Sequence, residues 1–183
     1  MTEMKILIVT LTYIEKSIID EIVNNLSSYG LEVDILFDSR KYLPISAFNW
    51  ERLQYDAEKV LSFLKSKYDF NYDSIIFLAD SDGYIDGYNF VFGLTIDNFA
   101  IIFLNRLREE FYNRKPDLEL FMKRVVKEVT HEAGHILGLG HCNTIGCVMN
   151  FSNTVEDVDK KQARFCKNCI YKIENLSKYL QRK

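Results

Sequence analysis

The sequence predicts an α/β (α+β) fold in which helices flank a mixed, twisted sheet. Near the N-terminus an apolar run, an amphipathic segment and an alternating segment follow one another, which is the order of a parallel strand–helix–strand unit. Further along, two short β-rich segments flank a turn, and a long amphipathic segment follows them. The 183 residues suit one domain with a substantial core.

The N-terminal unit comprises residues 5–37. Residues 5–11 predict a buried strand because they are apolar and carry no charge after Lys5. Residues 14–26 place apolar side chains at helical spacing, and Gly30 closes this helix. Residues 31–37 alternate apolar and polar side chains, as a half-buried strand does. No glycine-rich turn follows the first strand, so a nucleotide site is not indicated.

The middle of the chain predicts a connection, a helix, a strand and a turn. Residues 41–49, with Pro44, indicate a connection, and residues 51–68 a second amphipathic helix. Residues 73–80 predict a third, buried strand. The acidic segment 80–87 is compatible with calcium, but its spacing does not match an EF-hand loop, and its Asp-Gly pairs favour a turn.

A hairpin follows. Residues 89–95 and 100–104 predict two strands joined at Asp97 and Asn98, and we expect them at the edge of the sheet. Gly93 permits close backbone approach within the first of these strands. The polar segment 106–115 is expected to be a loop that borders a cleft.

A long central helix is predicted to begin at Pro116 and Asp117, because proline suits the first turn and an acid favours the positive end of the helix dipole. Gly138 ends this helix, since glycine adopts the left-handed conformation that turns the chain. The predicted buried stripe faces the sheet and consists of Leu118, Phe121, Met122, Val125, Val126, Val129, Ala133, Ile136 and Leu137.

The end of the central helix carries the pattern H-E-x-x-H-x-x-G-x-x-H. His131 and His135 are four residues apart, so both imidazoles project from one helix face and can bind one metal ion. The turn at Gly138 lets His141 return as a third ligand. Three ligands leave the fourth tetrahedral position open for water, and Glu132 can accept a proton from that water. A bare H-E-x-x-H also occurs by chance on ordinary helices, but this pattern is extended by the glycine and the third histidine.

Four cysteines follow in two close pairs, Cys142 with Cys147 and Cys166 with Cys169. Four thiolates complete the coordination of zinc, so this site is expected to be structural. We expect the bound zinc to attach the short C-terminal part to the central helix. The alternative is four buried or oxidised cysteines. Between the pairs, residues 155–164 predict a helix capped by residues 152–154, and residues 170–180 predict a charged terminal helix.

The interleaving of the histidines, the cysteines and Met149 resembles the archaemetzincins, a branch of the metzincin zinc peptidases, over about residues 130–169. The resemblance implies a metzincin-like fold, a catalytic zinc on His131, His135 and His141, and a second zinc on the cysteines. It also implies a methionine turn at Met149, and hydrolysis of peptide bonds by zinc-bound water with Glu132 as general base. Residues 89–95 become the candidate edge strand that holds an extended substrate, although a plain hairpin is the alternative.

One position departs from some metzincins. Those branches carry a tyrosine two residues after the methionine, whereas this chain has Phe151, which lacks a phenol. Stabilisation of the oxyanion must therefore come from elsewhere, and Tyr84 and Tyr88 are candidates.

Composition bounds the partners and the compartment. The net charge is −3 and no basic patch is present, so nucleic acid is not an expected partner. No stretch is apolar enough to span a membrane, and no secretion signal is visible, so we expect a cytoplasmic monomer that acts on a peptide or protein. We expect one catalytic domain, 1–183, divided into 1–138 and 139–183. Two alternatives remain: a non-catalytic or regulatory zinc-binding module, and a hydrolase of a non-peptide amide.

Overall fold

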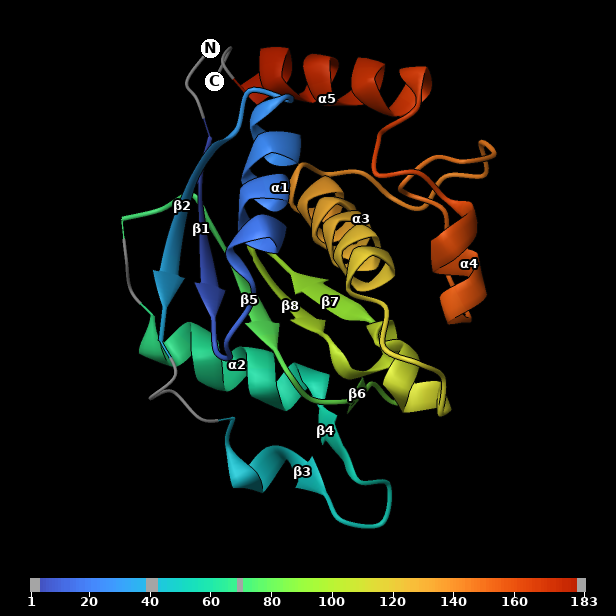
Figure 1. The fold of residues 1–183 in the computed structure, drawn as a ribbon. Helices are drawn as coiled ribbons and strands as arrows, with labels where there is room; N and C mark the ends of the chain where they lie inside the picture. The colour runs from blue at the N-terminus through green and yellow to red at the C-terminus, as the bar shows by residue number, and fades with distance from the viewer. Residues whose placement is uncertain (1–3, 39–42, 69–70, 181–183) are drawn as a thin grey trace.

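A five-stranded mixed sheet forms the centre of the computed structural model, which describes residues 4–38, 43–68 and 71–180 (Figure 1). The strand order is β2-β1-β5-β8-β7, and only β7 at the edge runs antiparallel to its neighbour. The mixed α/β fold predicted from the sequence is therefore confirmed. The strands are β1 (Lys5–Thr10), β2 (Glu32–Phe37), β5 (Ser74–Ala79), β7 (Gly93–Ile96) and β8 (Phe99–Phe103).

Helices cover both faces of this sheet (Figure 1). Helices α1 (Lys16–Ser27) and α3 (Leu118–Ile136) pack on one face, and α2 (Ala57–Lys67) packs on the other. Alternate residues of β1 supply both cores: Ile6 and Ile8 join α1 and α3, whereas Leu7 and Val9 join α2. A strand buried on both faces explains why this segment is a continuous apolar run.

The predicted helix 51–68 begins later than expected. Its first residues form strand β4 (Gln54–Asp56), which pairs with β3 (Phe48–Asn49) and β6 (Gly83–Tyr84) in a small second sheet. Leu53 adopts a positive φ of 55°, which no helix residue does. The Asp56 side chain then accepts a hydrogen bond from the Lys59 N–H and caps α2.

Four further segments differ from prediction. The predicted strand 89–95 is shorter at its start, because β7 begins only at Gly93. The expected connection 41–49 contains a short 3₁₀ helix, η1 (Ile45–Ala47), and strand β3, while residues 41–42 lie outside the described residues. The expected turn 80–87 contains β6, and Asp82 in it pairs with Arg106 at 2.7 Å. The expected loop 106–115 contains 3₁₀ turns, η2 (Asn105–Leu107) and η3 (Glu109–Tyr112).

Helix α3 ends before Gly138 as predicted, but it begins at Leu118, so Pro116 precedes the N-cap and does not lie in the first turn. The Asp117 carboxylate accepts a hydrogen bond from the Leu120 N–H, and Gly138 has φ of +87° just beyond the last turn. The predicted buried stripe is wrong only at Leu118, which is largely exposed because it is the first residue of the helix. The rest of the stripe is buried or half-buried against the sheet.

The C-terminal part contains α4 (Val155–Lys160) and α5 (Lys167–Leu180). Thr154 caps α4 in a reciprocal capping box with Asp157, but the helix ends four residues before the predicted boundary. A small third cluster of buried residues includes Leu139, Val148, Phe165 and, from α5, Cys169. Within the described residues, no helix is both long and apolar enough to cross a membrane.

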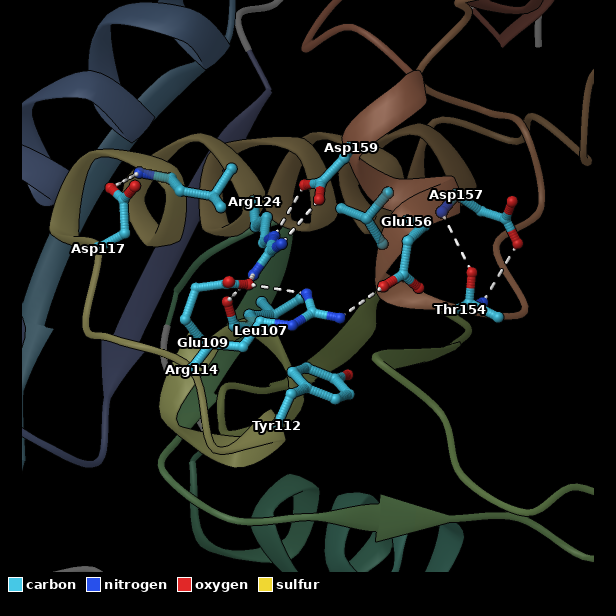
Figure 2. A network of polar contacts seen from close by, with 12 residues as sticks. Leu107, Glu109, Tyr112, Arg114, Asp117, Arg124, Thr154, Glu156, Asp157 and Asp159 are labelled. Atoms are coloured by element: carbon cyan, nitrogen blue, oxygen red, sulfur yellow. Dashed lines mark hydrogen bonds and ion pairs between the residues drawn. The ribbon is translucent and has the colours of Figure 1, made fainter.

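A buried arginine joins α3 to the segments beside it (Figure 2). Arg124 donates two hydrogen bonds of 2.7 Å to Asp159 of α4 and one of 2.7 Å to Glu109 of η3. Arg114 contacts the same Glu109 from the surface, at 3.5 Å. Although burial alone lowers the pKa of Arg124, the hydrogen bonds with Asp159 and Glu109 raise it overall, so the guanidinium stays charged.

Candidate metal centres

The three histidines of the extended pattern lie together at the C-terminal end of α3. His131 and His135 present their Nε2 atoms 3.1 Å apart, and ligand atoms of all three histidines lie within 4.8 Å of one another. Two imidazole ligands of a tetrahedral zinc ion are about 3.3 Å apart, given bonds of about 2.0–2.1 Å. The donor set and its spacing therefore fit a zinc ion with one position left for water or substrate.

Backbone carbonyls hold two of these rings in the required orientation. His131 Nδ1 lies 2.8 Å from the Val148 oxygen, and His135 Nδ1 lies 2.8 Å from the Leu139 oxygen. A carbonyl oxygen only accepts, so both Nδ1 atoms carry the proton and both Nε2 lone pairs remain available. Burial lowers the pKa of each histidine, most strongly for His131, and so favours the neutral form that binds metal.

Glu132 is buried beside the histidines and is positioned by the edge strand β7. Its Oε2 accepts a 2.5 Å hydrogen bond from the Thr95 hydroxyl. Gly93 lies against the same side chain, and a Cβ at this position would overlap the carboxylate. Burial raises the pKa of Glu132 to about 8, although the hydrogen bond from Thr95 opposes this shift.

A cavity of about 400 Å³ opens over this site. β7 forms one wall, the histidines and Glu132 another, and Phe151 contacts His141 with their ring centroids 5.0 Å apart. Tyr88 lines the cavity, but Tyr84 does not: its hydroxyl instead accepts a hydrogen bond from Asn49 at 3.3 Å. Of the two tyrosines expected from the sequence, only Tyr88 therefore borders the site.

The cavity also contains an ion pair that sequence reasoning missed. Lys161 Nζ lies 2.8 Å from Glu128 Oε1, with both side chains almost wholly buried. Glu128 is on the same face of α3 as His131 and His135, at a spacing that could have indicated it. Lys161 gives no such signal, because it comes from the segment after α4. Thr95 was likewise missed as a partner of Glu132.

The four cysteines form a second group. Cys142 Sγ lies 3.8 Å from Cys166 Sγ, Cys147 Sγ lies 3.7 Å from Cys169 Sγ, and all four sulfur atoms lie within 4.8 Å of one another. Two thiolates on a tetrahedral zinc ion are about 3.8 Å apart, given Zn–S bonds of about 2.3 Å, whereas disulfide sulfurs are about 2.05 Å apart. The spacing fits zinc with a complete thiolate shell and excludes disulfides in this conformation.

Met149 connects the two groups. Its side chain is fully buried against Gly134, which is on α3 between His131 and His135, and a Cβ at Gly134 would overlap its sulfur. The Met149 carbonyl accepts a hydrogen bond from the Cys142 N–H at 2.9 Å. Met149 thus makes an apolar contact with α3 between His131 and His135 and a backbone contact with the cysteine group.

Known proteins are similar to this chain in sequence and in fold. The model of peptidase family M54 matches residues 1–175. An archaemetzincin of Saccharolobus solfataricus is 92% identical, with 100% of both chains covered, and one of Sulfolobus acidocaldarius is 45% identical, with 92% of this chain and 96% of the relative covered. The crystal structure of the Methanopyrus kandleri archaemetzincin matches with a TM-score of 0.84 and 36% identity, covering 96% of each chain. This chain belongs to peptidase family M54, the archaemetzincin family, and is a zinc metallopeptidase.

Proposed function

We propose that the chain hydrolyses peptide bonds in peptides or proteins with Glu132 as general base and with His131, His135 and His141 as ligands of the catalytic zinc. The observation that carries this proposal is a buried glutamate, held by Thr95, that lines the same cavity as the three histidines. A pure metal carrier needs the histidines but has no need of this acid, so the rival of a non-catalytic or regulatory module is less well supported.

When bound, the metal supplies a Lewis acid that polarises the scissile carbonyl and lowers the pKa of a coordinated water. The Glu132 carboxylate takes the proton of the attacking water and then delivers it to the leaving amine. The hydrogen bond from Thr95 keeps the carboxylate directed into the cavity. β7 lines the same cavity, and among the described residues no strand pairs with its outer edge. This edge is a suitable site for an extended peptide to bind by strand addition.

We further propose a second, structural zinc on Cys142, Cys147, Cys166 and Cys169, giving two zinc ions per chain. In this proposal residues 1–183 are one catalytic domain, and the cysteine zinc attaches residues 139–183 to residues 1–138. A small part with few buried apolar residues gains stability from metal binding in this way. We propose that the enzyme acts as a cytoplasmic monomer.

The test is cleavage of a diverse peptide library by zinc-loaded protein beside Glu132→Ala, with zinc content measured in both. General-base catalysis predicts a fall in kcat/KM on the order of 10²–10⁴ in the variant, with zinc content unchanged. Small non-peptide amides assayed in parallel test the alternative substrate class. No cleavage of peptides by the zinc-loaded wild type would support the non-catalytic module instead.

A further inference from the structure

Three polar residues, Glu128, Lys161 and Ser152, also line the active-site cavity, and we call them its polar end. Glu128 lies one helical turn before Glu132 on α3, which corresponds to about 6 Å along the helix axis. At this separation Glu128 is too far from the bond being cleaved to contact it. It is instead within reach of the end of a long side chain on the substrate residue next to that bond. The polar end is therefore positioned to select a substrate side chain.

The two charges at this end are buried and compensate each other. The exposed fractions of the Lys161 and Glu128 side chains are 1% and 4%, and Nζ lies 2.8 Å from Oε1. The Lys161 ammonium has three donors, and its other contact, with the Asn150 carbonyl, is long at 3.5 Å. A buried ion pair that still has donors and acceptors without partners favours an uncharged ligand that can hydrogen-bond to them, because an added charge would be buried without a counter-ion.

Two oxygen atoms of the polar end, Glu128 Oε1 and Ser152 Oγ, lack hydrogen-bond partners among the described residues. Glu128 Oε1 does contact Lys161, but this contact is an ion pair without the alignment of a hydrogen bond. Both atoms are buried. Buried polar atoms nearly always have a hydrogen-bond partner, because a buried polar atom without one costs free energy. A substrate group that both donates and accepts hydrogen bonds would satisfy them.

We propose that this end of the cavity is a subsite for a side-chain amide, so that the enzyme prefers glutamine, and after it asparagine, beside the scissile bond. This inference rests on the proposed peptidase function. The amide oxygen accepts from Lys161 Nζ, and the amide NH₂ donates to Glu128 and Ser152. A substrate glutamate is repelled by the Glu128 carboxylate, and a substrate lysine is repelled by the Lys161 ammonium. A substrate leucine offers the ion pair no hydrogen bonds.

The experiment compares peptides that differ only at one residue, on either side of the scissile bond in turn, carrying Gln, Glu, Lys or Leu. Turnover is measured as kcat/KM with zinc-loaded wild type, and binding as Kd with zinc-loaded Glu132→Ala. We expect Gln to be favoured by about 10- to 100-fold at one of the two positions in both measurements, as hydrogen bonds to charged groups provide.

The double variant Glu128→Leu/Lys161→Met replaces the pair by apolar side chains of similar volume, a change that cores tolerate. We expect its preference to move from Gln to Leu with folding retained. The matched control, Glu119→Leu/Lys123→Met, makes the same changes on the exposed face of the same helix and should keep the preference for Gln.

The outcomes separate the inference from the proposed function. Turnover with equal rates for all four residues, or a double variant that keeps the preference for Gln, overturns the amide subsite and leaves the peptidase intact. Selective binding of the Gln peptide without turnover by the wild type supports the subsite and overturns the peptidase. Absence of both binding and turnover overturns both.

Discussion

Arg124→Met removes the cation at the centre of the network in Figure 2 and should destabilise the protein substantially. The guanidinium side chain is 1% exposed and binds carboxylates from two segments far apart in the sequence, Asp159 and Glu109. It also donates to the Leu107 carbonyl at 3.1 Å. Methionine fills a similar volume without charge, so the variant leaves two carboxylates without their main partner.

The magnitude follows from the burial of those carboxylates. Removing one partner of a buried pair costs about 3–5 kcal/mol. Two features reduce this cost in Arg124→Met: Asp159 is 33% exposed and can be rehydrated, and Glu109 still has Arg114 as a partner at 3.5 Å. We therefore take the lower end of the range of about 3–5 kcal/mol. We expect a loss of about 3 kcal/mol in the free energy of unfolding, and a fall in Tm of about 6–12 °C for a chain of this length.

The assay is urea unfolding followed by circular dichroism at one fixed zinc concentration, because bound metal contributes to apparent stability. Arg114→Met is the matched control: it removes an arginine that contacts the same Glu109, but this side chain is 48% exposed. The control should change stability by at most about 0.5 kcal/mol. Equal stability of the two variants would refute the assignment of Arg124 as the buried link between α3 and α4.

Three further outcomes are expected. Gly93→Ala should displace the Glu132 carboxylate and lower kcat about 100-fold with zinc retained. The control is Gly140→Ala, which should not disturb that carboxylate because a Cβ at this position meets nothing within 4 Å. An unchanged kcat in Gly93→Ala would contradict the packing of Gly93 against Glu132. Thr95→Val removes the hydrogen bond that lowers the pKa of Glu132, so the acid limb of the pH profile of kcat/KM should move to higher pH, and an unmoved limb would exclude this role. Cys169→Ser should reduce zinc content from about two ions per chain to about one, measured by elemental analysis, and a content of two would argue against a four-cysteine site.

Local sequence determined the elements whose signals lie within a few residues of one another. The Asp117 cap, the helical stripe and Gly138 set the ends and the buried face of α3, and each depends on near neighbours. His131 and His135 share a helix face because α-helical geometry requires it. The start of α2 was mispredicted because a cap at Asp56 and a strand before it outweighed the apolar spacing of residues 51–56.

Tertiary structure alone decided which side chains meet across layers. Thr95 and Glu132 are 37 residues apart, and Lys161 reaches Glu128 from beyond α4, so no local pattern relates either pair. These contacts depend on how β7 and the C-terminal part pack against α3. Such packing is set by the summed burial of the whole core rather than by the spacing of any one motif. The motif therefore indicates the chemistry, whereas the fold supplies the groups that orient Glu132 and shape the cavity beside it.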